Sequence, residues 1–85
     1  MSRQANAVAM IERQIAQIGT SQYPDAEFAK GMIQANYAHG FIDEQQLVEY
    51  EDRAAEAASR RRLSLRRASM GRRLDALGLL HGGAQ

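Results

Sequence analysis

The segment from residue 37 to residue 47 constrains the fold of this chain more than any other part of the sequence. It reads Tyr-Ala-His-Gly-Phe-Ile-Asp-Glu-Gln-Gln-Leu. Gly40 stands where a helix commonly ends, and Asp43 can cap a second helix, with Gln46 three residues later completing a capping box. Ile42 before the cap and Leu47 at the fourth helical position match a hydrophobic staple. The segment therefore predicts a tight turn between two helices.

Apolar residues before this turn repeat with helical spacing. Residues 3–18 are expected to form a helix that Gly19 ends in the usual glycine position. The apolar seam of this helix comprises Met1, Val8, Ile11, Ile15 and Ile18. A second helix is expected from Pro24, which suits a first helical turn, to about His39. It carries two adjacent stripes, wide enough to face two neighbours: Phe28, Met32 and Ala35, and beside them Ala29, Ile33 and Tyr37.

The third helix is expected to start at Glu44 and has no clear stop before Gly71. Its first apolar stripe comprises Leu47, Tyr50, Ala54, Ala57 and Ala58, and a second comprises Leu63, Met70, Leu74 and Leu77. The second stripe is offset by two residues, so one straight helix cannot point both stripes the same way. Either the helix breaks near residues 69–71 or its two halves face different partners. The pairs Glu49–Arg53 and Glu56–Arg60 have the spacing that stabilises helices.

These patterns predict an all-α fold: a small helical hairpin or bundle of three to four helices with a long arginine-rich third helix. At 85 residues the chain has room for one domain, expected over residues 1–80, with a flexible tail over residues 81–85. Large apolar side chains are sparse between residue 50 and Leu63. Because a chain this short buries limited surface, we expect oligomerisation, as a homodimer, to support the fold.

Charge is segregated along the chain. Residues 1–57 carry four basic groups against nine acids, a formal charge of −5, and residues 58–85 carry seven arginines against one acid, a charge of +6. The basic patch comprises Arg60, Arg61, Arg62, Arg66, Arg67, Arg72 and Arg73. A chain divided in this way is suited to a partner of opposite charge.

Four interpretations of the basic patch remain open. It can be a solvated helix face, or it can pair with the acids of residues 43–56 in an antiparallel second copy. It can neutralise nucleic-acid phosphates, although no aromatic residue is interleaved for base stacking. Residues 63–80 can also lie as an amphipathic helix on an anionic membrane, although no apolar run is long enough to span one.

Nothing in the sequence favours catalysis. His39 and His81 are far apart in sequence, and the clusters of carboxylates match no calcium or zinc pattern. There is no cysteine and no glycine-rich phosphate loop. We therefore expect a non-enzymatic protein without a catalytic residue, metal or cofactor. The N-terminal residues lack the apolar stretch of a signal peptide, which leads us to expect a cytoplasmic location.

Residues 33–54, from Ile33 to Ala54, place an aromatic residue, a glycine, an apolar pair and a capping residue before an acidic helix that reaches Asp-Arg. This arrangement resembles the short helical hairpins of small prophage-encoded host-takeover proteins, including the Kil-type cell-division inhibitors. The resemblance covers about a quarter of the chain and implies a phage or mobile-element protein that inhibits a host protein by surface contact.

Together these observations predict a helical protein-interaction module that binds and modulates a host protein. The expected partner-binding anchors are Tyr37, Phe41, Leu47 and Tyr50, as exposed aromatic and apolar side chains beside a charged rim. The alternative is a nucleic-acid-binding regulator that uses residues 60–73. The two classes differ in what remains bound after nuclease and high salt.

Overall fold

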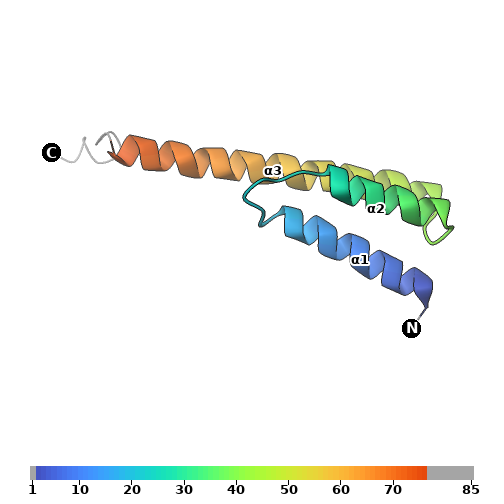
Figure 1. Cartoon of the computed structure of the whole chain (residues 1–85). Coiled ribbons are helices and arrows are strands. Elements are labelled where there is room, and N and C mark those ends of the chain that lie inside the picture. The colour runs from blue at the N-terminus through green and yellow to red at the C-terminus, as the bar shows by residue number, and fades with distance from the viewer. Residues whose placement is uncertain (1, 77–85) are drawn as a thin grey trace.

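A computed structural model of the chain describes residues 2–76 and shows three helices, with no strand among these residues. Helix α1 spans Arg3–Ile18, α2 spans Glu27–Ala38 and α3 spans Glu44–Ala76. Figure 1 shows α1 and α2 side by side along the first half of α3, and the second half of α3 extending beyond them. The all-α prediction and the long third helix are confirmed. The fourth helix of the wider prediction is not found in residues 2–76, and the expected tail lies outside them.

The turn between α2 and α3 has the predicted chemistry. Gly40 takes φ +77°, the Phe41 N–H donates to the Asn36 carbonyl at 2.9 Å, and the Gly40 N–H donates to the Tyr37 carbonyl at 3.0 Å. This is the Schellman pattern, and it depends on a residue that tolerates positive φ. The capping box also forms: Asp43 Oδ1 accepts from the Gln46 N–H at 2.8 Å, and Gln46 Oε1 accepts from the Asp43 N–H at 2.9 Å.

Helix α1 has the predicted bounds, whereas α2 begins later than predicted. Helix α1 begins at a Ser2 cap, whose hydroxyl accepts from the Ala5 N–H at 3.0 Å. It ends at Ile18, but Gly19 keeps φ −65°, so this glycine is not used for left-handed backbone. Helix α2 begins at Glu27, later than predicted, because Pro24 lies in the connector and the Asp25 carboxylate binds the Glu27 N–H at 2.9 Å.

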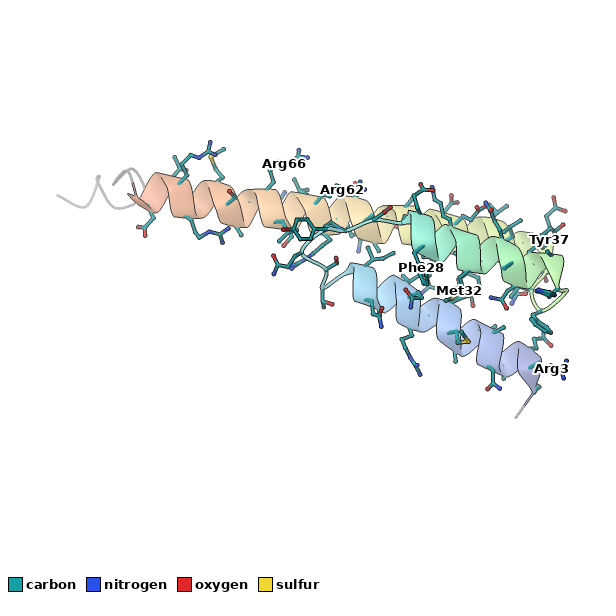
Figure 2. All side chains as sticks on the ribbon, viewed as in Figure 1. Arg3, Phe28, Met32, Tyr37, Arg62 and Arg66 are labelled. Carbon is teal, nitrogen blue, oxygen red and sulfur yellow. The ribbon has the colours of Figure 1, made fainter. Side chains whose placement is uncertain are left out.

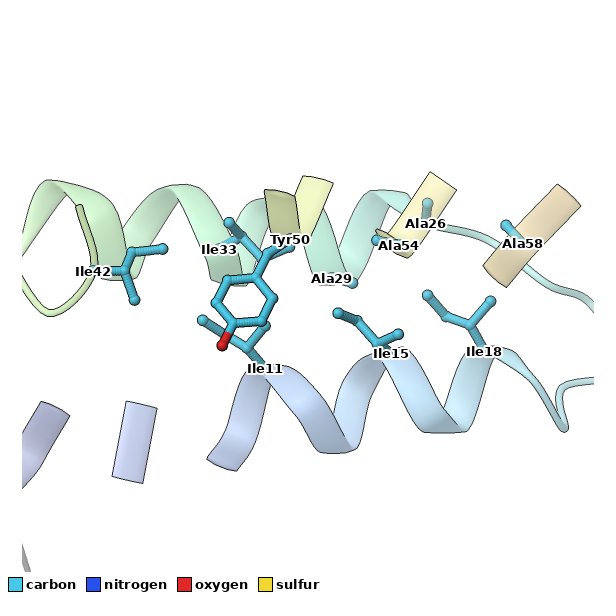
Figure 3. Close-up of a cluster of buried hydrophobic side chains, with 10 residues drawn as sticks. All are labelled: Ile11, Ile15, Ile18, Ala26, Ala29, Ile33, Ile42, Tyr50, Ala54 and Ala58. Atoms are coloured by element: carbon cyan, nitrogen blue, oxygen red, sulfur yellow. The ribbon is translucent and has the colours of Figure 1, made fainter. Parts of the chain in front are cut away.

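The core is one cluster shared by all three helices (Figure 3). It comprises Ile11, Ile15, Ile18, Ala26, Ala29, Ile33, Ile42, Tyr50, Ala54 and Ala58. The predicted seam of α1 and the first stripe of α3 are therefore confirmed, and Val8, Met32, Leu47 and Ala57 pack at the edge. Of the two stripes of α2, only Ala29 and Ile33 are buried, because α1 and α3 both cover that side of the helix, whereas Tyr37 of the same stripe is exposed. Met1 and Leu77 lie outside the described residues.

Helix α3 runs without a break through Gly71, so of the two alternatives that the sequence left open, the break near residues 69–71 is excluded. Its 33 residues correspond to a length of about 50 Å. The second half lies outside the bundle, and its apolar residues stay exposed, with Leu63 at 44% and Met70 at 49%. None of the helices within residues 2–76 is long and apolar enough to cross a membrane.

Candidate functional site

The four residues expected to anchor a partner fall into two groups. Tyr50 is buried at 8% exposure, and Leu47 packs against the core, so these two side chains hold α3 to the bundle. Tyr37 is 42% exposed and Phe41 is half-buried. The Phe41 ring stacks on His39 with 5.9 Å between ring centroids, so part of its surface serves the turn itself. Only Tyr37 and Phe41 therefore remain accessible as anchors.

The outer face of α2 offers a larger apolar surface. We use this name for Phe28, Gly31, Met32 and Ala35, which follow each other at steps of one, three or four residues. Phe28 is 68% exposed, Gly31 and Ala35 are exposed, and Met32 packs partly against the core. Phe28 and Met32 lie on the same side of the helix in Figure 2. The sequence predicted that this stripe and the one beside it would face two neighbours, but within residues 2–76 Phe28 and Ala35 stay exposed.

Gly31 gives this face an unusual feature. A side-chain carbon built on Gly31 would meet nothing within 4 Å, and the residue does not adopt positive φ. A glycine inside a helix costs about 1 kcal/mol relative to alanine. No contact within residues 2–76 explains this cost. Because Gly31 has no side chain, the surface of α2 is flat between Phe28 and Ala35.

A polar cluster fastens α1 to α3. The Arg53 guanidinium donates to both carboxylate oxygens of Glu12, at 2.9 and 2.5 Å, and it lies 5.4 Å from the centre of the Tyr50 ring. The hydrogen bond from Arg53 lowers the pKa of Glu12, and the same bond raises the pKa of Arg53. Burial raises the pKa of Tyr50, and the nearby Glu12 carboxylate raises it further. Arg53 thus pairs across the bundle with Glu12, not with Glu49 as predicted.

Some arginines of the basic patch bond to other parts of the chain, and the others are exposed to solvent. Arg61 Nε donates to the Ser21 carbonyl at 2.8 Å, and Arg62 donates to the Pro24 carbonyl at 3.3 Å, so both hold the connector between α1 and α2. Arg60 pairs with Glu56 at 2.6 Å, as predicted. The other four arginines are exposed: Arg66, Arg67, Arg72 and Arg73.

An aromatic residue reaches the basic patch from the connector. Tyr23 is 90% exposed, and with Pro24 and Leu65 it lines an open depression of about 700 Å³ to which Arg62 and Arg66 also contribute. Figure 2 shows these two arginines on α3 beyond the end of the bundle. The sequence argument that no aromatic accompanies the arginines therefore fails, because Tyr23 is close in space and distant in sequence.

Within residues 2–76, no three His, Asp or Glu side chains are grouped so that they could hold a metal ion. Comparison with known proteins adds no assignment, since no protein family, curated protein or solved structure matches the chain. The exposed surfaces that the described residues form include the outer face of α2 and the second half of α3.

Proposed function

We propose that this chain is a non-enzymatic protein-interaction module whose partner docks on the outer face of α2. The observation that carries the proposal is the 68% exposure of Phe28 beside an open Gly31. The resemblance of residues 33–54 to Kil-type proteins implies that the partner is a host protein and that binding inhibits it. Tyr37 lies nine residues from Phe28, a rotation of about 180° on the helix, so it is on another side of α2 and is not part of the proposed contact.

Physical reasoning supports this surface over a structural role. Fully burying a phenylalanine side chain gains about 1.5–3 kcal/mol, and most of that gain is left unused while Phe28 faces water. Aromatic residues surrounded by flat apolar surface are typical centres of protein–protein interfaces. Gly31 and Ala35 allow a partner helix to approach α2 closely. Within residues 2–76, most of the Phe28 side chain stays in water, and a side chain at Gly31 would meet nothing within 4 Å.

The test compares variants in an affinity capture from host lysate, treated with nuclease and washed at high salt. Phe28→Ser should abolish capture of the partner, whereas Tyr23→Ser, which removes an even more exposed aromatic, should leave it unchanged. Because Phe28 contributes little to the core, both variants should keep the wild-type helical content and unfolding midpoint. Capture that survives Phe28→Ser, with the fold intact, would exclude this surface.

Nucleic-acid binding is the second candidate function, and one observation favours it. Tyr23, Arg62 and Arg66 place a ring and two guanidinium groups around one depression, a combination suited to a base and its phosphate. Fluorescence anisotropy with a labelled single-stranded oligonucleotide tests it. Tyr23→Ser should weaken binding at all salt concentrations, and Arg66→Gln should also reduce the salt slope. If neither oligonucleotide DNA nor RNA binds at moderate salt, this candidate is eliminated.

A further inference from the structure

The side of α3 that faces away from α1 and α2 forms one continuous exposed surface along the helix. We call it the outer face of α3. Its members follow one another at steps of three or four residues, with Ser59 at the middle. The others are Val48, Asp52, Ala55, Leu63, Arg66 and Met70, and all are exposed.

This face lies opposite the buried one. Tyr50 is buried in the bundle, and Val48 lies two residues away, which on an α-helix is a rotation of about 200°. Val48 is accordingly 54% exposed, and with Glu44, Glu49 and Asp52 it lines a shallow depression of about 650 Å³. Further along, Leu63 lines a depression of about 230 Å³ with Arg62 and Arg66. An apolar side chain bordered by acids and another bordered by arginines therefore lie on the same face.

We propose that a second copy of this chain binds the outer face of α3, with the two α3 helices antiparallel. The register places Ser59 against Ser59 at the two-fold axis. Val48 then faces Met70 of the other copy, Asp52 faces Arg66, and Ala55 faces Leu63. Each contact occurs twice, because a two-fold axis makes the interface self-complementary.

Charge decides the orientation. In a parallel pair every residue of the face meets its own counterpart, so Asp52 would oppose Asp52 and Arg66 would oppose Arg66. In the antiparallel pair both repulsions become attractions between opposite charges. The Ser59 axis also overlaps the two helices over nearly the whole of α3, Glu44–Ala76, and thereby covers the most apolar surface.

Charge also favours a second copy over an anionic polymer or membrane. The outer face of α3 carries Asp52, with Glu49 and Glu44 beside it, as well as Arg66. A phosphate surface that followed the whole outer face of α3 would meet these acids as well as Arg66. A second copy presents both charges in reverse order, and its basic half extends beyond its own bundle far enough to reach the acidic half of the first.

A charge swap tests the pairing in nuclease-treated protein by sedimentation equilibrium. The wild-type chain should be a dimer. Asp52→Arg and Arg66→Asp should each weaken dimerisation by at least about a hundredfold, because each creates two like-charge contacts. The double variant should restore the dimer. Arg13→Asp, which makes the same charge change on an exposed site of α1, should have no effect. A monomeric wild type at high concentration, or a double variant no better than the singles, overturns the proposal.

Cysteine cross-linking tests the register, since the chain has no cysteine of its own. Ser59→Cys should form a disulfide between copies under mild oxidation. Val48→Cys alone should not, because the two sites would be about 33 Å apart in the antiparallel dimer. Mixing Val48→Cys with Met70→Cys chains should give the mixed disulfide. Cross-linking of Val48→Cys to itself would indicate a parallel pair and refute the register.

The proposal is independent of partner binding on α2, since the two surfaces lie on different helices.

Discussion

Truncation of Ile33 provides the most direct test of the bundle. Ile33 and Ile11 are the largest side chains that are fully buried within residues 2–76, and both have 0% exposure. Four of the ten core positions are alanines, and the other large side chains of the core are four isoleucines and one tyrosine. We therefore change Ile33 to Val, which removes one methylene group, and to Ala, which removes three carbons.

The expected magnitudes follow from this environment. Ile33→Val should cost about 1 kcal/mol, and Ile33→Ala about 3 kcal/mol through lost transfer energy and an added cavity. At the usual stability per residue, the roughly 55 residues of the bundle have a free energy of unfolding of roughly 3–8 kcal/mol. Ile33→Ala should thus remove between a third and all of the stability, whereas Ile33→Val should leave a folded protein.

Urea unfolding followed by far-ultraviolet circular dichroism measures both losses at a fixed protein concentration, which keeps any contribution from dimerisation constant. Met10→Ala is the matched control, because Met10 lies on α1 with 50% exposure and should cost less than about 1 kcal/mol. If Ile33→Ala loses no more stability than Met10→Ala, Ile33 is not at the centre of a packed core, and the arrangement of α2 between its neighbours is wrong.

Three further changes test individual features. Gly31→Ala should stabilise the fold by about 0.5–1 kcal/mol in thermal unfolding, because the added carbon meets nothing, and should weaken partner capture if a partner approaches α2 closely. Asp43→Ala should cost about 1 kcal/mol in urea unfolding by removing half of the capping box. Glu12→Gln should cost about 0.5–1 kcal/mol at neutral pH, a range that allows for the partial exposure of the Glu12–Arg53 pair. Since the pKa of Glu12 is lowered from 4.5, its contribution is complete above that pH and is lost as the pH falls through the lower folded value, so acid titration of stability should be shallower in Glu12→Gln.

Local signals in the sequence predicted the turn between α2 and α3 well. Gly40, Asp43 and Gln46 act through bonds to residues only a few positions away, so neighbouring positions contain most of the relevant information. The buried stripes of α1 and the first half of α3 were also predictable from their period. These elements are fixed by interactions within one or two turns of helix, or by burial of the only apolar side available.

The surface of α2 could not be predicted in the same way. Periodicity shows that Phe28 and Ile33 are both apolar positions on a helix, but it does not show that two neighbours both pack on the Ile33 side. Arg53 gives a similar result: Glu49 and Glu12 are both acids within reach, and only the packing of α1 against α3 favours Glu12. The proximity of Tyr23 to Arg66 depends on the path of the connector, which no local pattern specifies.

The apolar stripe of α3 changes to another side of the helix between its first and second halves. Since the helix continues through Gly71, the change of phase places Leu63 and Met70 on the side opposite Tyr50, where residues 2–76 supply no cover. An isolated helix about as long as the second half of α3 is only marginally stable in water without tertiary contacts. Its second half therefore depends on whatever binds the outer face of α3. A second copy would stabilise the second half of α3 in both chains, because the uncovered basic end of each chain is complementary to the acidic half of the other.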